Sequence, residues 1–126
     1  MKIAIPVFGK QVSPRFDFSP ELWIVTVENG KLIHQERLPM ANLNLSRRLE
    51  QITSNGVEKV ICGGIDGFTL NQLGSRGIDV VHDVMGEAEE AFHFFMRGRL
   101  RPGFCCGNRR VKGFSVRGRG AGGRRA

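Results

Sequence analysis

The residues best suited to chemistry in this chain are its three cysteines, its three histidines and one glycine-rich turn. Cys62 is followed directly by Gly63 and Gly64, at the end of an apolar run that predicts a buried strand. Cys105 and Cys106 are adjacent to each other, near the start of a basic C-terminal segment. Thiolates are soft ligands, so all three cysteines are candidates for metal–sulfur ligation, although a single buried Cys commonly packs as a small apolar side chain.

The glycine turn after Cys62 has the composition of an anion site. Gly63 and Gly64 let the backbone turn sharply and approach another group closely, and a helix is predicted to start near Gly67. The unpaired N–H groups and the dipole at a helix N-terminus favour negative charge. The alternative is ordinary turn chemistry, in which Asp66 serves only as the N-cap of that helix.

His82 is the histidine best placed to join this turn. It lies near the C-terminal end of a strand predicted over residues 78–84. If that strand is parallel to the strand that ends at Cys62, His82 and the two glycines share the sheet edge at which open α/β sheets bind ligands. His34 and His93 are interpreted as ordinary surface or packed histidines.

No spacing in the sequence indicates a catalytic centre. A nucleophile, a base and a group that orients the base cannot be matched to any recognised pattern. Asp17, Asp66 and Asp83 are carboxylates of the kind that bind metal ions, but nothing in the sequence unites them, and scaffold roles are the simpler interpretation. The sequence therefore favours a binding protein over an enzyme.

The elements that must position these residues alternate along the chain. The pair Asn29-Gly30 indicates a type I′ hairpin turn between two strands near the N-terminus, and later helices alternate with strands. Together they predict an α/β fold, a mixed sheet of about five strands with antiparallel N-terminal strands, flanked by about three helices. Strands are expected over residues 2–8, 22–27, 32–38, 57–62 and 78–84, and helices over residues 43–54, 67–75 and 87–96.

Charge divides the chain into two parts. Residues 1–96 contain nine basic and twelve acidic residues, whereas residues 97–126 contain ten basic residues and no acidic one. Beyond Gly98 the sequence is rich in Gly and Arg and has no hydrophobic period, so it cannot bury enough apolar surface to fold alone. We therefore expect an α/β domain over residues 1–97 and a disordered Arg/Gly-rich tail over residues 98–126.

The cysteine count and the hydropathy pattern predict a cytoplasmic protein. An odd number of cysteines, two of them adjacent, does not form a disulfide framework, and reduced thiols are the default inside cells. No apolar stretch reaches the roughly 18 residues that span a bilayer, and the N-terminus lacks the features of a signal peptide. No membrane partner is expected.

Several short motifs occur in order along the chain. They are MKIAIPV at the N-terminus, VSPRF at residues 12–16, the turn at residues 56–67, GIDV at residues 77–80, and GEAEEA at residues 86–91 followed by RGRL at residues 97–100. These motifs and the order of elements resemble the dinitrogenase iron-molybdenum cofactor biosynthesis domain family over about residues 1–100. The resemblance implies a ribonuclease-H-like mixed sheet and a role in carrying or inserting metal–sulfur cofactors.

One departure from the family pattern changes the expected chemistry. Many members have His-Phe-Gly where this chain has Arg15-Phe16-Asp17, so a fixed cation replaces a histidine that could ligate metal. Arg15 would then act on a cluster by charge and hydrogen bonding. The resemblance, combined with the residue types, predicts metal ligation by Cys105 and Cys106 and cofactor binding by Arg15, Phe16, Cys62, Gly63, Gly64 and His82.

Two functions follow from these features. The first is a non-enzymatic carrier for an anionic iron-molybdenum-type metal–sulfur cluster, whose partners are cofactor-biosynthesis or acceptor proteins. The second is a nucleic-acid-binding protein, because an Arg/Gly-rich tail resembles segments that bind single strands through charge and guanidinium stacking. Only Phe104 and Phe114 interleave that tail, and the first function also uses the folded domain, so it is preferred.

Overall fold

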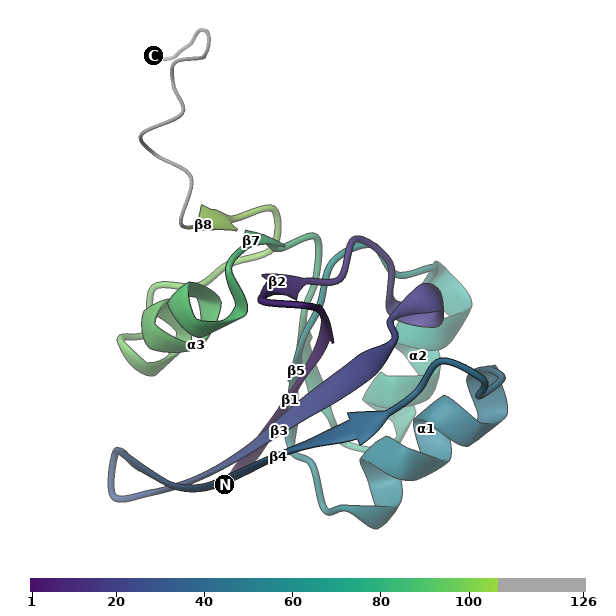
Figure 1. The fold of residues 1–126 in the computed structure, drawn as a ribbon, viewed down its shortest axis with the longest axis horizontal. Helices are drawn as coiled ribbons and strands as arrows, with labels where there is room; N and C mark the ends of the chain where they lie inside the picture. The colour runs from purple at the N-terminus through teal and green to yellow at the C-terminus, as the bar shows by residue number, and fades with distance from the viewer. Residues whose placement is uncertain (107–126) are drawn as a thin grey trace, which may run out of the picture.

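The computed structural model describes residues 1–106 and shows a mixed α/β fold (Figure 1). A six-stranded sheet is flanked by three helices, and a separate two-stranded sheet lies beside it. The elements are β1 (Lys2–Phe8), β2 (Gln11–Val12), the 3-10 helix η1 (Phe16–Phe18), β3 (Glu21–Glu28), β4 (Lys31–Pro39), α1 (Leu45–Ser54), β5 (Lys59–Ile61), α2 (Gly67–Ser75), β6 (Asp79–Val81), β7 (Met85–Gly86), α3 (Ala88–Met96) and β8 (Cys105–Cys106).

The sheet combines antiparallel and parallel pairing, as the sequence predicted. Its order is β4-β3-β1-β5-β6, with β2 paired to the end of β1. Strands β1, β3 and β4 are antiparallel neighbours, whereas β5 is parallel to β1 and β6 is parallel to β5. Asn29 and Gly30 have φ angles of 53° and 76°, which confirms the type I′ turn between β3 and β4. The short strands β2, β7 and β8 were not predicted.

The helices cover the two faces of the sheet separately. Helices α1 and α2 lie on one face and α3 on the other (Figure 1). Alternation along β1 sends Ile3 and Ile5 into the core shared with Phe92 of α3, and sends Ala4 into the core shared with Ile52 of α1. The central strand is therefore buried on both faces, which explains its nearly continuous apolar sequence.

The folded part continues past the boundary that the sequence placed between residues 97 and 98. Leu100 and Phe104 pack against the α3 side of the core, and the Met85 N–H donates to the Phe104 carbonyl at 2.9 Å. Isolated apolar residues in a Gly- and Arg-rich segment show no period, so the sequence pattern missed these contacts. The predicted disorder of residues 107–126 lies outside the described residues. Within residues 1–106 no helix is long and apolar enough to cross a bilayer.

Candidate functional site

A cavity of about 340 Å³ opens at the sheet edge where the parallel strands β5 and β6 end. It is lined by parts of three segments, and its walls are formed largely by backbone and apolar side chains. The three segments are Gln11 and Val12 of β2 together with Pro14, the Gly63-Gly64 turn, and residues 83–86, the last two of which form β7. Crevices at this edge are where open α/β sheets bind ligands.

The glycine turn is shaped by contact with the loop that follows β2. The Gly64 N–H donates to the Pro14 carbonyl at 2.7 Å, and the Phe16 N–H donates to the Gly64 carbonyl at 2.8 Å. A Cβ atom at Gly63 would lie 2.3 Å from the Ser13 carbonyl oxygen. The glycines thus allow the close approach that the sequence predicted, and the group approached is the backbone of the loop after β2.

The backbone N–H of Gly63 is the donor that remains for a ligand. Gly63 is buried and lines the cavity, and its carbonyl accepts from the Asp83 N–H at 2.8 Å. Within residues 1–106 its own N–H makes no hydrogen bond. Because a buried, unsatisfied N–H costs free energy, this group is a fitting donor for a sulfide, oxo or other anionic atom in the cavity.

His82 lies at the edge that the sequence predicted for it, directly after β6. Its Nδ1 is 2.7 Å from a carboxylate oxygen of Asp83, and its side chain is partly exposed. Asp83 itself has a φ of 58° and lines the cavity, so the backbone reverses here before β7. The pair places one imidazole and one carboxylate beside the cavity.

Cys62 and Phe16 occupy the hydrophobic core and do not face the cavity. Cys62 is fully buried among Ala4, Leu22 and other apolar side chains, and Phe16 is 2% exposed in the same cluster. Burial, reinforced by the nearby Asp83 charge, raises the pKa of the Cys62 thiol to about 12. A thiol in this environment stays protonated, so the packing alternative describes Cys62 better than the ligand role does.

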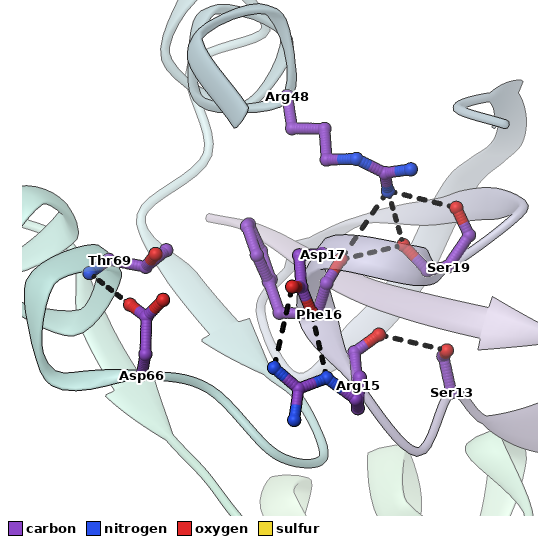
Figure 2. A network of polar contacts seen from close by, with 8 residues as sticks. All are labelled: Ser13, Arg15, Phe16, Asp17, Ser19, Arg48, Asp66 and Thr69. Atoms are coloured by element: carbon purple, nitrogen blue, oxygen red, sulfur yellow. Dashed lines mark hydrogen bonds and ion pairs between the residues drawn. The ribbon is translucent and has the colours of Figure 1, made fainter. Parts of the chain in front are cut away.

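Arg15 lies beside the glycine turn with its guanidinium at the surface. Its Nε is 3.1 Å from a carboxylate oxygen of Asp17 (Figure 2). Its backbone pairs with Gly64, and its guanidinium lies over the Phe18 ring. The hydrogen bond and the charge of Asp17 raise the pKa of Arg15, and the nearby Asp66 charge adds to the shift. The cation is therefore already paired, and it does not line the cavity.

Pairing of β7 with β8 sets the backbone of the C-terminal cysteines beside two residues that line the cavity. The register sets Cys105 beside Met85 and Cys106 beside Gly86, and both partners line the cavity. Cys105 is exposed, as is the Met85 side chain. Among the described residues no three His, Cys, Asp or Glu side chains are grouped closely enough to hold a metal ion by themselves.

Arg48 is a structural residue of the site that the sequence analysis missed. It is 3% exposed, and its guanidinium donates to the Ser19 carbonyl at 2.9 Å (Figure 2). It also donates to the Leu43 carbonyl at 3.0 Å. Burial lowers the pKa of Arg48, while the Asp17 charge opposes that shift. The side chain thus ties α1 to η1, the element that follows Arg15. Its spacing of three and four residues from Leu45 and Ile52 marked it as a position on the apolar face.

Comparison with known proteins places this architecture in a family. The family model described as dinitrogenase iron-molybdenum cofactor matches residues 1–98. An uncharacterized protein of Methanocaldococcus jannaschii is 27% identical over 105 residues, which cover 79% of this chain and 89% of that protein.

Solved structures give the same fold. The crystal structure of PH0822 has a TM-score of 0.75 at 25% identity and covers 81% of this chain and 94% of its own. The apo form of the orange protein from Desulfovibrio gigas has a TM-score of 0.67 at 18% identity, with 80% and 91% covered, and shows a likeness of fold alone. Since the family model spans the whole sheet and all three helices, the chain belongs to the dinitrogenase iron-molybdenum cofactor family.

Proposed function

We propose that this protein is a non-enzymatic carrier that binds an anionic metal–sulfur cluster of the iron-molybdenum type and delivers it to cofactor-biosynthesis or acceptor proteins. Family membership supports the general role in cofactor biosynthesis. The cavity at the ends of β5 and β6 supports a bound cargo, because its size is within the usual range for ligand pockets, roughly 300–1,000 Å³.

The observation that carries the proposal is the pairing of β7 with β8. It sets the Cys105-Cys106 backbone alongside Met85 and Gly86, at the rim of the cavity. Thiolate and thioether sulfurs are soft ligands that suit iron, molybdenum and copper in sulfide-rich clusters. In this proposal Cys105 and Cys106 ligate the metal atoms. The Gly63 N–H, which has no partner within residues 1–106, donates a hydrogen bond to a sulfide or oxo group of the cluster.

The remaining candidates have secondary roles in this proposal. Gly64 shapes the turn through its bond to Pro14, and His82 lies beside the cavity through its contact with Asp83. Arg15 contributes positive charge near the turn, reduced by its ion pair with Asp17. Cys62 and Phe16 act through the core, because both are buried away from the cavity.

The test is an anaerobic spectroscopic titration of the full chain with tetrathiomolybdate, with and without added ferrous or cuprous ions. The wild type is expected to give a saturable charge-transfer spectrum with a defined stoichiometry. The double variant Cys105→Ser/Cys106→Ser is expected to lose at least tenfold in affinity, whereas Cys62→Ala, a matched loss of one thiol in the core, is expected to bind as the wild type does.

Two outcomes would contradict the proposal. One is the absence of any spectral change with the wild-type chain under strictly anaerobic conditions. The other is equal cluster affinity of the Cys105→Ser/Cys106→Ser variant and the wild type, which would remove the cysteines from the site and leave the β7–β8 pairing without a role in binding.

A further inference from the structure

A second cavity lies where α3 ends and the chain turns towards β8. It has a volume of about 400 Å³ and is lined by Phe94, Arg99, Arg101 and Phe104. None of these four residues lines the cavity at the end of β5 and β6. The proposed cluster site makes no use of this cavity, although it contains an aromatic pair and two cations.

The aromatic pair is held in place by the fold. The rings of Phe94 and Phe104 meet edge to face, with their centroids 4.9 Å apart, and both residues pack partly against the core beneath α3. Backbone hydrogen bonds fix the intervening turn, from the Arg99 N–H to the Phe94 carbonyl at 2.9 Å and from the Phe104 N–H to the Arg101 carbonyl at 3.1 Å. The rings therefore form a preorganised, half-exposed apolar surface.

The two arginines beside this surface are unpaired. Both are exposed, and within residues 1–106 neither Arg99 nor Arg101 makes an ion pair or a side-chain hydrogen bond. By contrast, the guanidinium groups of Arg15, Arg37 and Arg48 all have partners in the protein. Among the described residues no acidic side chain lines the cavity, and the sequence from residue 97 onward contains ten basic residues and no acidic one.

We propose that this aromatic–arginine cavity binds single-stranded nucleic acid. A base exposed in a single strand can pack on the Phe94–Phe104 surface, while Arg99 and Arg101 bind the flanking phosphates or stack on the base. The sequence of residues 107–126 contains seven further Lys and Arg residues, so the chain beyond this cavity has charge of the same sign. Two other ligands fit these features less well. The acidic side chains of a protein would pair with the arginines but would not stack on the aromatic rings. The base faces of a duplex are stacked on one another and are not available to the Phe94–Phe104 surface.

The proposal is tested with the full chain and a fluorescein-labelled oligouridylate of twelve nucleotides, followed by anisotropy over a range of salt concentrations. The variant Arg99→Gln/Arg101→Gln is compared with Arg47→Gln/Arg76→Gln, which removes the same charge from exposed positions in α1 and directly after α2. The first variant is expected to lose about tenfold in affinity and to reduce the salt slope by about 1.4, which corresponds to two phosphate contacts. The control is expected to change affinity less than twofold.

A second variant separates stacking from charge. Phe104→Leu keeps an apolar side chain for the core but removes the ring, so we expect about a fivefold loss of affinity or more with an unchanged salt slope. Circular dichroism melting checks that the variant is folded. The proposal is overturned if the Arg99→Gln/Arg101→Gln variant binds like its control, since binding then resides in the rest of the basic segment. It is equally overturned if a duplex of equal charge or polyglutamate binds as tightly as the single strand.

Discussion

Gly63 is the residue at which the absence of a side chain matters most for the site. An added Cβ atom would lie 2.3 Å from the Ser13 carbonyl oxygen and 2.8 Å from that of Pro14, closer than real contacts allow. At Gly64 the corresponding distance to Pro14 is 3.1 Å, a milder crowding. The glycine pair is therefore required by the loop that packs against it.

The prediction at this position is that Gly63→Ala destabilises the protein by about 2 kcal/mol, because a backbone atom and not a flexible side chain must move aside. Gly67→Ala is the matched control, since a Cβ atom at the first residue of α2 has no neighbour within 4 Å. Urea denaturation followed by circular dichroism measures both. Equal stability of the two variants would show that the backbone at Ser13 and Pro14 moves away from the added Cβ atom at little cost in free energy.

Cys62 makes the stability depend on alkaline pH. Its thiol has a pKa of about 12 in the folded protein, against 9.0 for an ordinary thiol, because burial disfavours the thiolate. The unfolded chain therefore loses this proton first, so the contribution to stability is complete below about pH 9 and is lost as the pH rises towards 12. We expect the free energy of unfolding to fall more steeply over this range in the wild type than in Cys62→Ala. The free energy of unfolding of both proteins is measured as a function of pH, and coinciding profiles would contradict the prediction.

At the scale of elements, Arg48 joins helix α1 to the loop that carries Arg15 and η1. Its guanidinium donates to the carbonyl and the hydroxyl of Ser19 (Figure 2). It also donates to the Leu43 carbonyl. These neutral partners accept hydrogen bonds from Nε and Nη1 without neutralising the charge. The arrangement fixes the path of the loop, whose other end contacts the glycine turn.

Replacing Arg48 by Met is expected to destabilise the protein by roughly 2–3 kcal/mol, because buried carbonyls lose their donors while the apolar volume is largely kept. Arg47→Met, one residue away on the exposed side of α1, is the control and should change stability by less than about 0.5 kcal/mol. Thermal denaturation compares the two. A small effect at both positions would indicate that water replaces the guanidinium.

At the scale of the whole molecule, the segment after α3 belongs to the fold. Phe104 packs against Phe94, its carbonyl accepts from the Met85 N–H, and β8 pairs with β7 at the cavity rim. A chain ending at residue 100 loses all three interactions, whereas a chain ending at residue 106 keeps them. We expect the shorter chain to melt about 5 °C or more below the longer one. Calorimetry of the two truncated chains measures this difference, and equal melting temperatures would mean that residues 101–106 contribute nothing to stability.

The sequence alone determined the features that depend on neighbours along the chain. Alternating and helical periods located the five main strands and three helices, Asn29-Gly30 specified the hairpin turn, and the order of elements gave the mixed sheet. Because β5 and β6 are parallel, His82 lies at the same edge of the sheet as the glycine turn, as expected. These features follow from local propensity and from the period of apolar residues, which are properties of short stretches.

Only the tertiary structure decided which side chains meet. Cys62 follows β5 and lies in the core because the sheet is covered there, and Gly63 faces Ser13 because the loop after β2 folds onto the turn. Cys105 comes beside Met85 through a two-residue pairing that no periodicity can signal. Such contacts join residues far apart in sequence, and their free energy comes from burial and hydrogen bonds that exist only once the whole chain has folded.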